Sequence, residues 1–330
     1  MKTKTMKTKR NFMPILAVLG MVAVFTFSSC EKDDDVMINP TPTEPTADIV
    51  KLASTNPDLS ILAEALTRAN LVSALEGSGP FTVFAPTNEA FNQLLNDLGA
   101  TSLDDISTDI LTNVLLYHVL NGKVTSMEIE PGYVNTLSIG PDNNQVSLLV
   151  GYNDSSNKNT AAAVNTNILF LNNDASVVTA DVMATNGVVH VINKVLLPPN
   201  VVDLAIDNSS FSILVEAVVK AELVETLMGD GPFTIFAPTN AAFEELFAQL
   251  KVSGVQDLTK DQLVPILLYH VVSGNVRSSD LSSRNVSTLN GEISIEVGSM
   301  VTINDNTNVV YTDVQGVNGV IHVIDKVLLP

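Results

Sequence analysis

The sequence has 330 residues, which exceeds the usual size of one hydrophobic core, so two domains are expected. Hydrophobic residues make up 45% of the chain and charged residues 16%, a composition that excludes an intrinsically disordered protein. The net charge of −19 would repel phosphate backbones and anionic headgroups, so we expect no nucleic-acid partner, and any link to a membrane must be covalent.

The first 29 residues have the pattern of an export signal. Five basic residues precede position 11, and a mostly apolar run of 16 residues follows from Phe12 to Phe27. This run is shorter than the ~20 residues that cross a bilayer, so residues 1–29 are interpreted as a signal peptide. Two serines then precede Cys30, the only cysteine, in an arrangement that resembles the lipobox of bacterial lipoproteins. The resemblance implies lipid attachment at Cys30, and the alternative is an ordinary signal with an incidental cysteine.

Residues 30–46 are predicted to be an acidic linker that becomes rich in Pro and Thr. Its segment Glu31–Asp35 resembles the export tag of Bacteroidetes surface lipoproteins, and the alternative is a solvated spacer. The part rich in Pro and Thr is expected to be extended and semi-rigid. Together with Cys30, these features predict a lipid-anchored protein of the outer membrane, exposed at the cell surface.

The rest of the chain consists of two copies of one sequence repeat. Three segments recur in the same order, the first two at an offset of 152 residues and the third at 132. They are Gly79–Phe91 with Gly231–Phe243, Leu115–Val119 with Leu267–Val271, and Asp181–Pro198 with Asp313–Pro330. The change of offset places 20 extra residues within 140–176 of the first copy. We therefore predict domains at residues 47–199 and 200–330, with a surface insertion in the first.

Helices and strands are expected in different halves of each copy. Apolar residues at helical spacing predict helices over 59–75 and 211–227, and a further helix is expected over 109–120. The later halves alternate, which predicts strands over 146–150, 177–181 and 188–192, and over 293–297, 309–313 and 320–324. Asn186-Gly187 and Asn318-Gly319 are typical of hairpins between such strands. Helices followed by strands predict an α+β fold.

At these repeated segments the chain resembles the fasciclin, or FAS1, family. The Thr-Val-Phe-Ala-Pro-Thr-Asn segment, the Tyr-His pair and the Asn-Gly-Val-Val-His-Val-Ile segment match the family's motifs, in order, in both copies. The resemblance implies a twisted, wedge-like β-sheet assembly packed with helices in each domain. It also implies a role mainly in extracellular adhesion.

In animal matrix members of that family, integrin contacts are assigned to an Asp-Ile pair before the last motif and to the Tyr-His region. Carried onto this chain, the resemblance gives six candidate partner-binding residues, Asp181, Val182, Asp313, Val314, Tyr117 and Tyr269. The alternatives are tyrosines packed in the core and aspartates that cap a turn.

All four histidines occur as repeated pairs, and we predict that they are structural. His118 follows Val114 and Ile110 at helical spacing, and His190 shares a strand face with Val188 and Ile192. His270 and His322 are the equivalent residues of the second copy. The sequence has no metal-ligand spacing, phosphate loop or nucleophile motif, so neither a metal, a cofactor nor an enzymatic activity is expected.

Two functions remain open from the sequence. The first is a non-catalytic cell-envelope lipoprotein that mediates adhesion to an extracellular protein or polysaccharide through two fasciclin domains. The alternative is a glycan or small-molecule capture protein that serves an outer-membrane uptake system. The alternative predicts a concave, partly apolar pocket near the insertion of the first copy.

Overall fold

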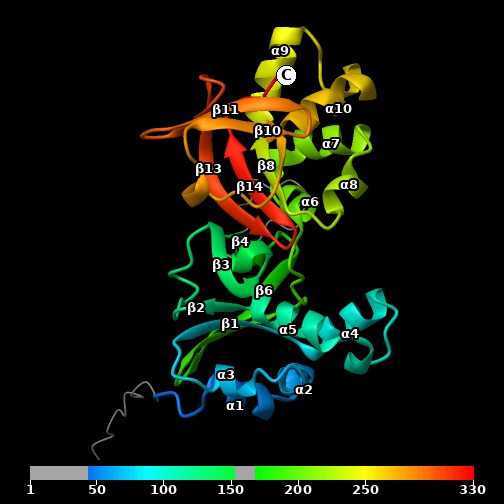
Figure 1. Ribbon diagram of the computed structural model, residues 1–330. Coiled ribbons are helices and arrows are strands. Elements are labelled where there is room, and N and C mark those ends of the chain that lie inside the picture. The colour runs from blue at the N-terminus through cyan, green and yellow to red at the C-terminus, as the bar shows by residue number, and fades with distance from the viewer. Residues whose placement is uncertain (1–43, 153–167) are drawn as a thin grey trace, which may run out of the picture. The chain divides into compact units, whose positions relative to one another are not determined.

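The computed structural model describes residues 44–152 and 168–330, which form two domains of helices and strands (Figure 1). The expected signal peptide, Cys30 and all but the last three residues of the expected linker lie outside the described residues. So does the middle of the expected insertion, residues 153–167.

Within its described residues, the first domain begins with three short helices and one strand, and two more α-helices then precede the remaining strands. Thr87 starts one of its helices, because its hydroxyl accepts a hydrogen bond from the backbone N–H of Ala90 at 3.2 Å. The elements are α1 Ile49–Thr55, α2 Ser60–Arg68, α3 Val72–Leu75, β1 Phe81–Pro86, α4 Asn88–Asp97, α5 Thr108–Tyr117, β2 Val119–Asn121, β3 Gly132–Ile139, β4 Gln145–Tyr152, β5 Leu169–Leu171, β6 Ala175–Ala184 and β7 Gly187–Ile192.

The second domain repeats this order. Thr239 caps its fourth helix as Thr87 does in the first domain, with the N–H of Ala242 as donor. The elements are α6 Val201–Ile206, α7 Ser212–Lys220, α8 Val224–Met228, β8 Phe233–Pro238, α9 Asn240–Leu250, α10 Lys260–Tyr269, β9 Val271–Ser273, β10 Arg284–Thr288, β11 Gly291–Val297, β12 Val301–Ile303, β13 Thr307–Gly316 and β14 Gly319–Ile324.

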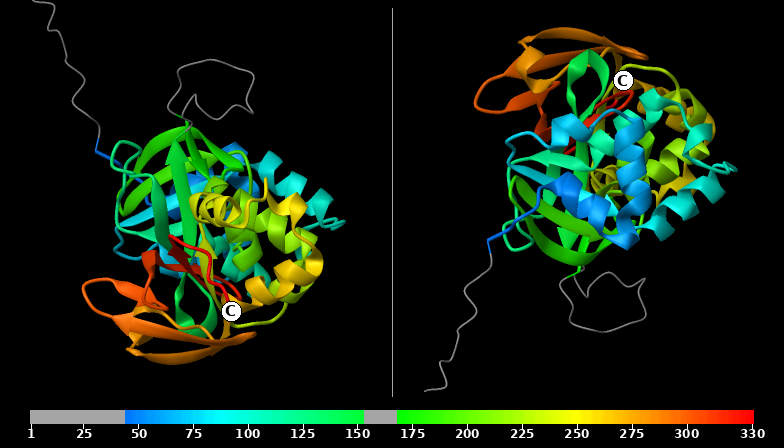
Figure 2. Two further views of the ribbon diagram at one scale, coloured as in Figure 1. Left: turned by 90° about the horizontal axis from the view of Figure 1, so that it is seen from above. Right: turned by 90° about the horizontal axis from the view of Figure 1, so that it is seen from below.

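The strands of the first domain form a closed barrel in the order β1 to β7. β1 runs parallel to β7, from Phe81 beside Gly187 to Pro86 beside Ile192, which brings two repeated motifs together across more than 100 residues of chain. The second domain repeats this parallel pair with β8 and β14, in a seven-stranded sheet of order β10-β11-β12-β13-β14-β8-β9. In both domains the helices pack on one side of the strands (Figure 2). The predicted α+β class of two tandem domains is confirmed.

Each domain has two hydrophobic clusters, one between helices and strands and one among the strands. β1 contributes to both, because Val83 and Ala85 face the helices while Phe84 faces Leu148 and Leu171 among the strands. Each aliphatic or aromatic side chain buried in this way contributes roughly 1.5–3 kcal/mol to stability. The two clusters fix β1 and its parallel partner from both sides.

The helix predicted over residues 59–75 is broken in the structure into α2 and α3. Asn70 lies between them with φ 55°, and the second copy breaks at Glu222 with φ 57°. A left-handed residue ends a helix, but the apolar spacing runs on through the break. The helix predicted over 109–120 also ends early, because α5 stops at Tyr117 and β2 begins at Val119.

The 20 extra residues of the first domain fall into two parts. Tyr117 and Tyr269 are 152 positions apart, but the backbone carbonyls that their hydroxyls bond, those of Ser147 and Glu292, are 145 apart. Seven extra residues therefore lie in the β3–β4 hairpin, and the other 13 lie between β4 and β5. The insertion is an extended hairpin together with a longer connection.

The extended β3–β4 hairpin contacts the second domain. The hydroxyl of Ser147 accepts a hydrogen bond from the backbone N–H of Gln315 at 3.0 Å. Near the hairpin tip, the side-chain oxygen of Asn144 accepts one from the guanidinium of Arg277, also at 3.0 Å. Part of the sequence that distinguishes the first domain thus lies at its contact with the second.

Candidate functional site

The first histidine of each domain is buried and ties two distant segments together. The Nδ1–H of His118 donates to the carbonyl of Val114 at 2.7 Å, and Nε2 accepts from the backbone N–H of Leu196 at 2.9 Å. Because Nε2 accepts from an amide, the ring is neutral with its proton on Nδ1. Burial lowers its pKa to about 4. The second copy makes the same two bonds through His270, Ile266 and Leu328.

The second histidine lies inside the sheet next to an aromatic ring. His190 stacks on Phe84 with ring centroids 5.6 Å apart, and its Nε2–H donates to the carbonyl of Val124 at 3.0 Å. Its Nδ1 faces the backbone N–H of Asp181 at 3.3 Å. His322 repeats this arrangement on Phe236, and burial lowers the pKa of His322. Both ring nitrogens of each histidine are therefore engaged inside the domain.

Asp181 fastens a loop to a bulged strand. Its backbone is left-handed, with φ 60°, where the pairing of β6 with β7 shifts register. The carboxylate accepts hydrogen bonds from the backbone N–H of Ser126, at 2.8 Å, and from its hydroxyl. Burial alone would raise the carboxyl pKa, but these two hydrogen bonds outweigh it and lower the pKa of Asp181.

The second domain has the equivalent hydrogen bonds between Asp313 and Ser278. We call these two residue pairs, Asp181 with Ser126 and Asp313 with Ser278, the aspartate locks. Asp313 has φ 64°, and its carboxylate accepts from the N–H of Ser278 at 2.8 Å and from the Ser278 hydroxyl. Arg277 adds a guanidinium 3.5 Å away. Burial alone would raise the pKa of Asp313, but the hydrogen bonds from Ser278 and the charge of Arg277 outweigh it and lower the pKa. In both domains the aspartate carboxylate therefore accepts hydrogen bonds from a serine of a neighbouring loop.

The candidate tyrosines and valines lie at different depths. Tyr117 is fully buried, and its hydroxyl donates to the carbonyl of Ser147 at 2.9 Å; burial raises its pKa. Tyr269 is 7% exposed and bonds the carbonyl of Glu292 in the same way. Val314 is 1% exposed, whereas Val182 is partly buried against the helix-side cluster. Of the six candidates, only Asp181, Asp313 and Val182 lie near a surface.

An exposed aliphatic residue stands just before each aspartate lock. Val178 of β6 is 55% exposed and Val310 of β13 is 56% exposed, and the two are 132 positions apart, as in the repeat. Each lies at the first register shift of its strand and points outward, while the preceding residue, Val177 or Val309, packs among the strands. We name Val178 and Val310 the outer valines.

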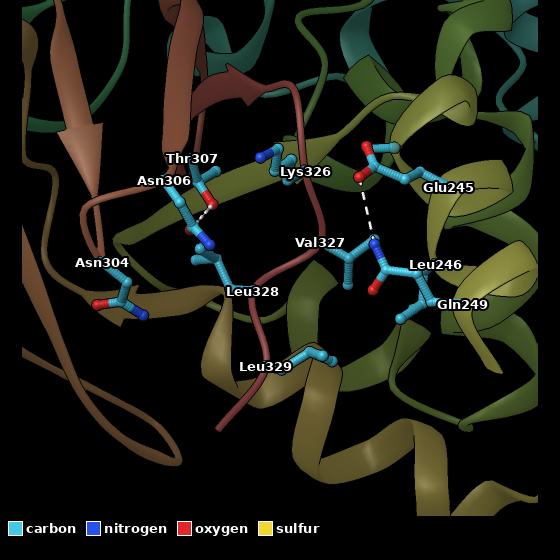
Figure 3. Close-up of a pocket in the computed structure, with 11 residues that line it drawn as sticks. Glu245, Leu246, Gln249, Asn304, Asn306, Thr307, Lys326, Val327, Leu328 and Leu329 are labelled. Atoms are coloured by element: carbon cyan, nitrogen blue, oxygen red, sulfur yellow. Dashed lines mark hydrogen bonds between the residues drawn. The ribbon is translucent and has the colours of Figure 1, made fainter.

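A cleft recurs between the fourth helix of each domain and the segment after its last strand. In the second domain it has a volume of about 240 Å³, with Glu245 and Gln249 of α9 opposite Asn306 and Lys326 (Figure 3). In the first domain the volume is about 350 Å³. The equivalent polar residues there are Gln93, Asp97, Asp174 and Lys194.

The comparison with protein families matches both domains. The model of the Fasciclin domain matches residues 57–198 and again residues 209–330. The chain belongs to the fasciclin family. The family resemblance inferred from the repeated motifs is therefore confirmed. Both fasciclin domains contain the histidine hydrogen bonds and the aspartate lock described above.

Similar proteins come from bacteria and animals. Protein sll1483 of Synechocystis is 47% identical to this fasciclin chain over 132 residues, 39% of this chain and 73% of that protein. Transforming growth factor-beta-induced protein ig-h3 of Sus scrofa is 32% identical over 263 residues, 78% of this chain and 35% of that protein. The cell surface glycolipoprotein MPB83 of Mycobacterium bovis is 35% identical over 158 residues, 46% and 60% of the two chains.

The chain thus spans only about a third of the length of the pig protein. Among solved structures, a FAS1 domain pair from the insect cell adhesion molecule fasciclin I aligns with 83% of this chain and 97% of its own, at 20% identity and a TM-score of 0.48.

Two further features are absent from the described residues of the fasciclin domains. Across residues 44–152 and 168–330, no three His, Cys, Asp or Glu side chains are grouped so that they could hold a metal ion. Within the same ranges, none of the helices combines the length and the apolar character needed to cross a bilayer.

The sequence did not reveal the partners of the aspartates. Ser126 and Ser278 lie at the same offset of 152 as the first motifs, so the repeat contained a signal for them. The neighbouring residues differ, which hid that signal. The Asn186-Gly187 pair signals a turn but not the role of the Asn186 side chain, whose buried amide donates to the carbonyls of Leu75 and Gly77 and so joins the turn before β7 to the helices.

Proposed function

We propose that this fasciclin chain is a cell-envelope lipoprotein, anchored through Cys30, whose two domains adhere to an extracellular protein or polysaccharide. The observation that carries the proposal is the pair of outer valines. Both are aliphatic side chains that are more than half exposed, and they occupy equivalent positions at the same bulge of the two domains.

The rigidity of the bulge supports contact through this surface. Asp181 and Asp313 hold the bulged strand to a neighbouring loop by two hydrogen bonds each. An aliphatic group on a fixed backbone loses little conformational entropy when it is covered by a partner. One outer valine is a weak contact, and two on one chain strengthen each other through effective concentration.

A binding role is favoured over catalysis because none of the four histidines has a free ring nitrogen for proton transfer. All four histidines use both ring nitrogens for contacts within the domain. Among the relatives, MPB83 is named a cell surface glycolipoprotein, which supports location at the cell surface.

The adhesion proposal is tested by binding. A form that starts at residue 30, with Cys30→Ser, keeps every residue of the described cores, and it is applied to immobilised matrix proteins and polysaccharides. Saturable binding that an unrelated protein of equal charge does not show supports adhesion. Equal binding by that control protein refutes specificity.

The anchor and the surface location are tested on cells. Metabolic labelling with a fatty acid should label the chain, and Cys30→Ser should abolish the label. Protease added to intact cells should degrade the protein. A chain that carries no lipid, or one that survives the protease while a known surface protein is cut, contradicts this part of the proposal.

The cleft of the first domain favours a second candidate, capture of a glycan or small molecule for an uptake system. It lies beside β5, directly after the insertion, and its 350 Å³ is within the usual range of ligand pockets. Lys194, Asp174 and Asn172 supply polar groups, and Leu94 and Leu98 supply apolar ones. A thermal-shift screen with mono- and oligosaccharides tests it, since a ligand of the folded state raises the melting temperature.

A further inference from the structure

The second domain contains an apolar cavity of about 110 Å³ between α6, α7, α8 and the sheet. Leu214, Val218, Leu227 and Ile321 are among the aliphatic side chains that line it. His270 is the one polar side chain in the lining, and both of its ring nitrogens are already bonded to backbone groups. Because a buried water needs two to four polar partners, this cavity has nothing to hold water.

The cavity reaches the surface through an apolar rim. Ile206 and Val219 both line it, and each is 58% exposed. Exposed aliphatic side chains beside an empty apolar space leave hydrocarbon in contact with water on one side and with no atoms on the other. A hydrocarbon group that entered would remove both costs.

The first domain provides an internal comparison. Its equivalent space is only about 10 Å³, too small for more than one water. Leu66 occupies the position of Val218 and adds one carbon there. At the rim, Ser54 and Thr67 stand in place of Ile206 and Val219. One domain is thus closed with a polar rim, and its twin is open with an apolar rim.

We propose that the second domain binds the end of an alkyl chain in this cavity, with the polar head of that molecule in water. The volume is about three-quarters of the ~150 Å³ of an engineered cavity that binds benzene, so it suits about four carbon atoms. The absence of a free polar group in the lining excludes recognition of the head. The site is separate from the outer valines and does not depend on the adhesive role.

Binding is tested by titration of 1-pentanol and of pentanoate into the chain from residue 30 with Cys30→Ser, with labelled Val, Leu and Ile methyl groups. We expect saturable shifts of the methyl resonances of Val218, Leu227 and Ile321, and none at Leu66 in the first domain. Binding of both probes supports the site with a charged or an uncharged head, and binding of 1-pentanol alone supports it with an uncharged head only. No saturable shift at the cavity, or equal shifts in both domains, overturns the proposal.

Matched variants test the cavity itself. Val218→Leu installs the residue of the first domain, and we expect at least a tenfold loss of affinity with unchanged shifts elsewhere. The double substitution Ile206→Ser with Val219→Thr alters only the rim and should weaken binding severalfold, which keeps the test independent of core repacking. The reverse change, Leu66→Val, should create weak binding in the first domain. Unaltered affinity in both Val218→Leu and the rim variant refutes the site.

Discussion

The ring of His118 accepts a hydrogen bond from the backbone N–H of Leu196 at 2.9 Å, across 78 residues of chain. The same ring donates to the end of α5, so one imidazole holds the segment after β7 against a helix. His270 holds Leu328 in the second domain at the same distance. His118 and His270 therefore each hold the segment after the last strand of their domain against a helix.

Removal of His118 should destabilise the first domain. His118→Ala leaves the buried N–H of Leu196 and the carbonyl of Val114 without their partners, and it leaves a cavity. We expect a loss of about 2–4 kcal/mol in the free energy of unfolding, measured by urea denaturation. His270→Ala should do the same in the second domain. A loss below about 0.5 kcal/mol in both variants contradicts the structural role.

The same histidines predict how stability depends on pH. Their pKa in the folded protein is about 4, below the ordinary value of 6.5, so the unfolded chain binds more protons between these values. Stability is therefore fully present above pH 6.5 and is lost as the pH falls through 4. We expect the melting temperature to fall over this window, and to fall less in the double variant His118→Ala, His270→Ala. An equal slope in both proteins argues against buried neutral rings.

The aspartate lock predicts energetic coupling between Asp181 and Ser126. Asp181→Asn and Ser126→Ala each remove a charge-assisted hydrogen bond, and each should cost about 1–2 kcal/mol in the free energy of unfolding. The double variant should cost less than the sum, which a double-mutant cycle measures. Asp313→Asn with Ser278→Ala is the matched pair. Strict additivity in both domains means that the side chains do not interact.

Two glycines with left-handed backbones should differ in their tolerance of a side chain. A Cβ at Gly79 would lie 2.2 Å from the carbonyl oxygen of Asn186, whereas one at Gly99 would meet nothing within 4 Å. Gly99→Ala should therefore cost only about 1 kcal/mol, from its positive φ. Gly79→Ala should cost more than about 3 kcal/mol because backbone must also move. Thermal melts of the two variants compare them directly, and equal losses contradict the close approach at Gly79.

Most of the fold was predictable because its determinants are repeated in the sequence. The duplicated motifs located two domains of helices followed by strands, and helical spacing placed His118 on an inward face. The break at Asn70 was not predictable, since apolar spacing continues through it. Nor was the cavity, because its lining differs between the two domains at several positions and its size depends on how the helices pack against the sheet. The spacing of apolar residues in a sequence does not determine how closely their side chains pack.

The central claim is that the outer valines form an adhesive surface. Its most direct test is to substitute both valines and measure the affinity for a partner identified in the binding experiment. Val178→Glu with Val310→Glu places charge at both bulges. Leu98→Glu with Leu250→Glu makes the same change at two other exposed residues related by the repeat, and because Leu98 lines the cleft of the first domain, this pair also reports on the second candidate site. Dissociation constants are measured for both double variants. The account predicts at least a tenfold loss of affinity in the valine variant, a smaller loss for each single valine, and little change in the leucine variant. Unchanged affinity in the valine variant, with loss in the leucine variant, would contradict it.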